Sequence, residues 1–106
     1  MAETTITNEE KVQAILAPIT LAGKPAQVDG KPAWSIISGD STLEVADDGL
    51  SAFLVSSDTL GDTIYQAKAD ADLGEGVEEL ILTVKLTVVS ARAANLGLTF
   101  ATPIPK

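Results

Sequence analysis

The chain has 106 residues, with 7 basic and 15 acidic side chains and a net charge of −8. This length suits one domain with a single core. The absence of cysteine and histidine excludes disulfides, thiolate metal sites, cysteine nucleophiles and imidazole catalysis. The acidic excess argues against nucleic acid as a partner, because phosphate contacts need clustered Lys and Arg.

Hydrophobic residues make up 45% of the chain and aromatic residues only 4%. The core is therefore expected to consist mainly of Val, Leu, Ile and Ala. A few large side chains would anchor it. These expected anchors are Trp34, Phe53, Tyr65 and Phe100.

Residues 1–10 form a polar N-terminal segment. Thr7 or Asn8 would cap a short helical turn, with Glu9 and Glu10 placed favourably for its dipole. The segment lacks the basic and apolar regions of a signal peptide. No apolar run approaches the ~18 residues of a membrane helix. We therefore expect synthesis in the cytoplasm and no membrane partner.

The next part of the chain alternates between extended and turn-like stretches. Residues 11–18 alternate apolar and polar side chains and predict a first strand that ends at Pro18. Residues 19–32 are expected to be a connecting loop with a turn at Asp29-Gly30. Pro32 favours an extended backbone before it, so a second strand is predicted from Ala33 to Ser38.

A hairpin is the clearest local feature of the sequence. Residues 42–45 predict one strand, and residues 50–56 predict its partner. Ala46-Asp47-Asp48-Gly49 would reverse the chain between them, since Gly49 is free to take a positive φ.

Two longer strands follow. Residues 63–72 would point Thr63, Tyr65 and Ala67 inward, with Tyr65 half-buried and its hydroxyl at a sheet end. Residues 80–89 have the strongest period-two pattern of the chain. Their inward positions are Leu80, Leu82, Val84, Leu86 and Val88. Short strands separated by turns predict an all-β sandwich of about seven strands over residues 11–89, with Trp34 as its central packing anchor.

Residues 90–106 exceed what a seven-strand sandwich needs. Apolar residues recur in this segment at Leu96, Leu98, Phe100 and Ile104, and Pro103 and Pro105 flank the last of them. The segment is either an additional strand of the same sandwich or an arm that pairs with a neighbouring subunit or another partner by strand addition. In the second case these four apolar side chains are the partner-binding residues.

Candidate chemistry is sparse. Asp70, Asp72 and Glu75 could supply oxygen ligands to Ca²⁺, although their spacing is not that of an EF-hand loop. The alternative is a solvated acidic edge. Paired carboxylates without aromatic platforms offer little to hold a sugar. We therefore expect no catalytic residues, no cofactor and no enzymatic activity.

The order of several short motifs resembles the bacterial immunoglobulin-like group 2 domain, over roughly residues 28–89. The motifs are Trp34-Ser35, Leu43-Glu44-Val45, Asp47-Asp48-Gly49-Leu50-Ser51-Ala52 and Gly61-Asp62-Thr63-Ile64-Tyr65-Gln66-Ala67. The resemblance implies an immunoglobulin-like β-sandwich with N- and C-terminal extensions. The Gly61-Asp62-Thr63 step and the turn over residues 70–77 depart from the family pattern and leave the strand register open.

The whole pattern, including Val28-Asp29-Gly30, residues 69–77 and Ala94-Asn95-Leu96, resembles single-domain immunoglobulin-like proteins of tailed phages and prophages. This second resemblance implies a non-enzymatic virion structural protein, made in the host cytoplasm and located on the particle surface. The first expectation is a capsid decoration protein that binds the major capsid protein and sister copies. The alternatives are a tail accessory protein, and a carbohydrate or cell-surface adhesion module assisted by Ca²⁺.

Overall fold

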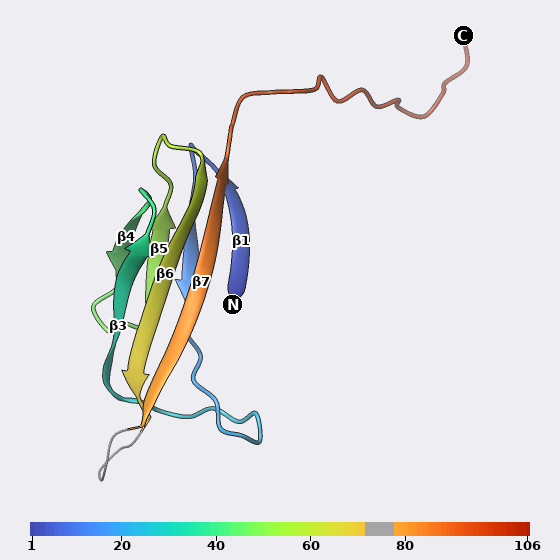
Figure 1. Ribbon diagram of the computed structural model, residues 1–106. Coiled ribbons are helices and arrows are strands. Elements are labelled where there is room, and N and C mark those ends of the chain that lie inside the picture. Colours follow the sequence, from blue (N-terminus) through green and yellow to red (C-terminus); the bar gives the residue numbers. More distant parts are fainter. Residues whose placement is uncertain (72–77) are drawn as a thin grey trace.

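The computed structural model describes residues 1–71 and 78–106. Within these residues the chain forms seven strands and no helix (Figure 1). The strands are β1 (Ala2–Thr7), β2 (Lys11–Ile15), β3 (Asp29–Ser38), β4 (Thr42–Val45), β5 (Ser51–Val55), β6 (Gly61–Asp70) and β7 (Glu79–Val89). In the described part of the chain, no helix is long and apolar enough to cross a membrane.

The strands form two sheets that pack face to face, which confirms the predicted β-sandwich. One sheet has the order β1-β7-β6-β3 and the other the order β2-β5-β4. Strand β1 is parallel to β7, whereas the other pairings are antiparallel. Strands β3, β6 and β7 have 10, 10 and 11 residues, but the strands of the second sheet have only 4 or 5. The second sheet therefore covers only part of the first.

The core lies where the two sheets overlap. The predicted alternation in β6 and β7 is confirmed, because Tyr65 and Leu86 are completely buried between the sheets. In the second sheet, Leu54 of β5 faces them and is also buried. The remaining buried hydrophobic residues are Ile6, Ala52, Ala67, Val84 and Val88. Removal of this apolar surface from water is the main stabilising contribution to the fold.

The N-terminal segment is a strand, so the expected helical turn at Thr7 and Asn8 is wrong. Ala2–Thr7 pairs along Val84–Val89 of β7 and buries Ile6 against the core. Its β-branched residues suit a pleated strand better than a helix. The N–H of Thr7 donates to the Glu10 carboxylate at 2.8 Å, and this hydrogen bond lowers the pKa of Glu10.

The prediction for the beginning of β3 is also wrong, by four residues. The strand starts at Asp29, and its register against β6 shifts between Asp29 and Ala33. Gly30 lies in this irregular stretch with a φ of 73°. The expected turn at Asp29-Gly30 is therefore an irregular stretch within a strand, where the positive φ of the glycine accompanies the shift of register.

The hairpin of β4 and β5 has the predicted position. Gly49 has a φ of 71°, and its N–H donates to the carbonyl of Ala46 at 2.9 Å. The pairing runs from Thr42 opposite Val55 to Val45 opposite Ala52. The local Asp-Asp-Gly chemistry thus predicts the reversal correctly.

The aromatic residues divide between the core and the surface. Tyr65 is fully buried, which corrects the expectation of a half-buried ring, and its hydroxyl donates to the Thr42 carbonyl at 3.1 Å. Burial raises the pKa of Tyr65. Trp34 is half-buried on β3, and its indole N–H donates to the Gly49 carbonyl at 2.8 Å. The ring therefore joins β3 to the reversal of the other sheet.

Of the four expected anchors, Tyr65 belongs to the buried core cluster, whereas Trp34, Phe53 and Phe100 lie outside it. Phe53 occupies an outward position of β5, between the inward residues Ala52 and Leu54, and the Lys11 ammonium lies 4.5 Å from its ring centre. Phe100 lies beyond the last strand and is 89% exposed. Strand alternation accounts for the position of Phe53, and the projecting C-terminal segment accounts for that of Phe100.

Candidate binding site: an apolar cleft and an apolar arm

The edge of the longer sheet along the first residues of β7 is open. Strand β1 begins at Ala2, opposite Val84. Residues 79–83 of β7 therefore pair on one side only, with β6, among the strands that the structure describes. A strand edge of this kind presents unpaired backbone groups to any extended chain that reaches it.

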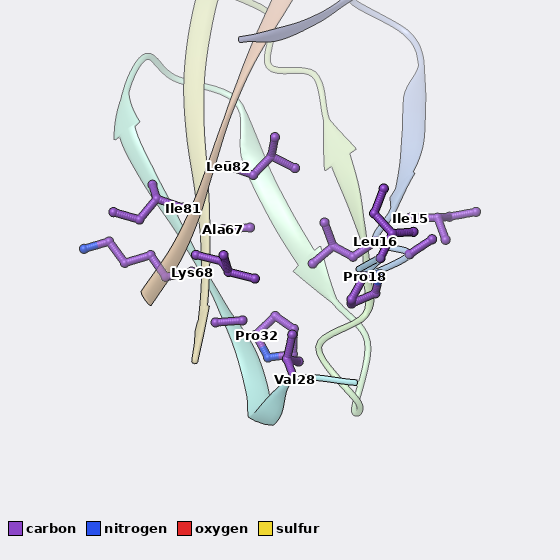
Figure 2. Close-up of a pocket in the computed structure, with 13 residues that line it drawn as sticks. Ile15, Leu16, Pro18, Val28, Pro32, Ala67, Lys68, Ile81 and Leu82 are labelled. Atoms are coloured by element: carbon purple, nitrogen blue, oxygen red, sulfur yellow. The ribbon is translucent and has the colours of Figure 1, made fainter. Parts of the chain in front are cut away.

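An apolar cleft of about 330 Å³ lies beside this open edge. Leu80 and Leu82 of β7 line one wall, and residues 15–19, which continue from β2, line the other. Figure 2 shows Leu82 pointing toward Ile15 and Leu16, whereas Lys68 and Ile81 point away from them. We call this space the cleft. Its wall residues Leu80 and Ile15 are 47% and 70% exposed, so residues 1–71 and 78–106 leave the apolar surface of the cleft uncovered.

Residues 90–106, which we call the arm, form no strand and project away from the sandwich (Figure 1). They leave β7 at Val89, the end of the strand opposite to the cleft. The four apolar residues singled out in the sequence are almost fully exposed there. They are Leu96, Leu98, Phe100 and Ile104. The structure thus groups these predicted partner-binding residues on one uncovered segment.

The arm is joined to residues 1–89, which we call the body, at its first residues. The N–H of Ala91 donates to the side-chain oxygen of Asn8 at 3.1 Å. Further along, the side-chain oxygen of Asn95 accepts from the N–H of Gly97 at 2.7 Å, and Gly97 has a φ of 67°. This turn separates Leu96 from the residues that follow. The part of the arm in which apolar residues can alternate along one extended segment therefore begins at Leu98.

Comparison with known proteins adds no relative to these observations. No protein-family model matches the chain, and no curated protein matches it. The cleft and the arm are therefore the features that bear on function.

Charge is distributed unevenly between the body and the arm. All 15 acidic residues and five of the seven basic residues belong to the body, which gives it a net charge of −10. The arm contains Arg92 and Lys106 and no acidic residue, which gives it a charge of +2. Opposite charges steer two surfaces toward each other and disfavour partners of the wrong sign.

The candidate Ca²⁺ ligands are only partly visible. Asp70 ends β6 opposite Glu79, whereas Asp72 and Glu75 lie outside the described residues. In the ranges 1–71 and 78–106, no three acidic side chains come together in a way that could hold a metal ion. The Ca²⁺ hypothesis stays a prediction.

Sequence reasoning missed the cleft. Residues 15–19 carry the apolar sequence Ile-Leu-Ala-Pro-Ile, which breaks the alternation of the strand predicted over residues 11–18. A continuous apolar run of this kind is a signal that both faces of the segment contact other surfaces. The position of β1 against β7 was the missing information, because it determines which part of the edge stays open.

Proposed function

We propose that this protein is a non-enzymatic structural accessory protein of a tailed-phage particle, which it joins through its C-terminal arm. The first candidate within this class is a capsid decoration protein on the particle surface, bound to the major capsid protein. The observation that carries the proposal is an arm of exposed apolar residues that the body leaves uncovered, exemplified by Phe100. The family resemblance of the sequence supports the phage assignment.

The strand order supports an immunoglobulin-like form of the sandwich. In that fold, strands B, E and D share one sheet, and strands C, F and G share the other. Strands β2, β5 and β4 correspond to B, E and D, and strands β3, β6 and β7 correspond to C, F and G. Trp34 lies on β3, where immunoglobulin domains carry their core Trp. Strand β1 lies beside β7 as an additional edge strand.

An arm of this kind binds by a simple mechanism. An extended segment that adds to a sheet edge gains affinity from main-chain hydrogen bonds and specificity from alternate side chains that enter pockets. On a shell with many identical sites, neighbouring copies also raise the effective concentration of one another. Weak individual contacts are then sufficient for full occupancy.

The test is binding to phage heads that were assembled from the major capsid protein without this protein. The full-length chain should bind stoichiometrically, and a chain truncated after Val89 should not. The truncation removes no strand and no buried residue, so the body is expected to fold alone. Phe100→Asp should weaken binding, whereas Thr99→Asp adds the same charge on the opposite side of the extended arm and should weaken it less.

Three outcomes would change the assignment. Binding to purified tails but not to heads would identify a tail accessory protein. Equal binding of the full-length and truncated chains would remove the arm from the interface. Failure of the full-length chain to bind either part of the particle would overturn the virion function.

A further inference from the structure

We propose that the arm of one copy docks in the cleft of a second copy, where residues 98–102 add to the open edge of β7. This inference deepens the proposed function by naming the partner of the arm, and it rests on the assignment of the arm as an assembly contact. Each copy has one arm and one cleft, so the contact can close as a reciprocal dimer or as a ring.

The open edge of β7 has a defined set of backbone groups. The N–H of Asn8, which follows β1, donates to the carbonyl of Val89 at 2.9 Å. That carbonyl therefore points to the β1 side of β7. Along a strand, the backbone groups of alternate residues point to the same edge, so those of Glu79, Ile81 and Thr83 also point to the β1 side. No strand in the described part of the chain pairs with them there.

The arm has a matching asymmetry. Leu98, Phe100 and Ile104 have even numbers and share one face of an extended chain, whereas Pro103 and Pro105 have odd numbers. In an extended arm, the backbone groups of odd-numbered residues point to one edge and those of even-numbered residues point to the other. Because proline has no N–H, the odd-numbered edge lacks two donors, whereas the even-numbered edge keeps all of its donors. Prolines in sheets occur where the edge faces solvent. The even-numbered edge of the arm is thus the one suited to pair with β7.

These two patterns select a parallel orientation. In a parallel pair, a residue whose backbone groups point toward the neighbouring strand lies beside a residue whose groups point away. Even-numbered arm residues then lie beside Leu80 and Leu82, and their side chains enter the cleft. An antiparallel arm would place the same side chains beside Ile81, on the outer face. Strand β1 is already parallel to β7. The docked arm would run in the same direction as β1 and lie beside the part of β7 that β1 does not reach.

A second copy fits this site better than the arm of the same chain. The arm starts at Val89, at the far end of β7, and β1 already occupies the edge along Val84–Val89. To reach its own cleft, the arm would have to turn back across β1. The body has a charge of −10 and the arm a charge of +2, so the arm of any copy is attracted to the body of another.

The chain has no cysteine, which makes disulfide cross-linking between two single-cysteine variants a direct test. One copy carries Ala101→Cys in the arm, and the other carries Ile81→Cys on the exposed outer face of β7. Mixed under mild oxidation, they should form a heterodimeric disulfide. Ser35→Cys, on the outer face at the opposite edge of the same sheet, is the matched control and should not cross-link to the arm.

A second measurement compares the self-association of arm variants that carry no introduced cysteine. Sedimentation equilibrium should show self-association of the full-length chain that is lost on truncation after Val89. Phe100→Asp should weaken it by about tenfold or more, because apolar anchors in a pocket dominate such contacts. Thr99→Asp should weaken it less, since its side chain points away from the cleft.

Two results would overturn the inference and leave the proposed function intact. One is a full-length chain that binds phage heads through its arm but stays monomeric and does not cross-link at Ile81→Cys. The other is a double variant, Ala101→Cys with Ile81→Cys, that forms the disulfide within one chain at high dilution, because the arm would then occupy its own cleft. Cross-linking without binding to heads or tails would support arm docking and reject the phage assignment.

Discussion

At the scale of single residues, Gly49 is a tightly constrained position of the body. It has a φ of 71°, and a Cβ built there would lie 2.7 Å from the carbonyl oxygen of Pro32. Its own carbonyl accepts the indole N–H of Trp34. We expect Gly49→Ala to lower the free energy of unfolding by about 2 to 4 kcal/mol, since strain at positive φ and a steric clash act together. Denaturant unfolding measures this change.

Gly23 provides the control for this prediction. Its φ is 78°, but a Cβ there would meet no atom within 4 Å. Gly23→Ala should therefore lose only about 1 to 2 kcal/mol, the contribution of the backbone conformation alone. Equal losses at the two positions would show that the contact between Gly49 and Pro32 does not constrain the reversal.

The second residue-scale prediction concerns Tyr65 and alkaline pH. Burial raises the pKa of its phenol, whereas the unfolded chain titrates near the ordinary value of about 10. The folded state then holds the proton more tightly than the unfolded state. The stability that depends on this proton is complete below pH ~10 and is lost as the pH rises toward the folded pKa.

Tyr65→Phe isolates this effect. The variant keeps the buried ring but loses the hydrogen bond to the Thr42 carbonyl, which should cost about 1 kcal/mol at neutral pH. Between wild type and variant, the difference in unfolding free energy should shrink as the pH rises above ~10. Denaturant unfolding at several pH values measures it. A difference that stays constant into the alkaline range would contradict the assignment to Tyr65.

At the scale of elements, β7 divides into a buried half and an open half. Leu86 is fully buried, whereas Leu82 points into the cleft and is 41% exposed. Leu86→Ala should cost about 2 to 5 kcal/mol, as expected for a cavity in a packed core. Leu82→Ala should cost about 1 kcal/mol, because much of its apolar surface is already in water. Similar losses in thermal or denaturant unfolding would mean that the cleft is covered in solution.

Strand alternation also explains how much of the fold could be predicted. The period-two patterns around Tyr65 and Leu86 identify β6 and β7, and the turn chemistry at Gly49 identifies the hairpin of β4 and β5. Strand β1 was missed because Thr7 and Asn8 are good capping residues, and its pairing with β7 depends on tertiary contacts that no local signal encodes. The cleft could not be predicted for the same reason, since it lies between residues 15–19 and the part of β7 that precedes the pairing with β1.

At the scale of the whole molecule, the arm dominates the shape. The radius of gyration is 19.2 Å and the longest dimension is 76 Å, whereas a compact domain of this length has a radius of gyration of about 13 Å. The arm was recognised in the sequence because its apolar residues alternate after the last strand. The sequence could not show whether the arm forms another strand of the same sandwich. That outcome depends on which sheet edges are left unpaired near Val89, and the strand order of the assembled sheets determines those edges.

The last prediction follows from this division into body and arm. A chain truncated after Val89 keeps every buried residue and loses the exposed hydrogen bond between Ala91 and Asn8. For the monomer at low concentration, its free energy of unfolding should stay within about 1 kcal/mol of the full-length value. Small-angle scattering should show the radius of gyration falling toward about 13 Å. A much larger loss of stability would mean that the arm packs on its own body in solution, which would also argue against its docking on a second copy.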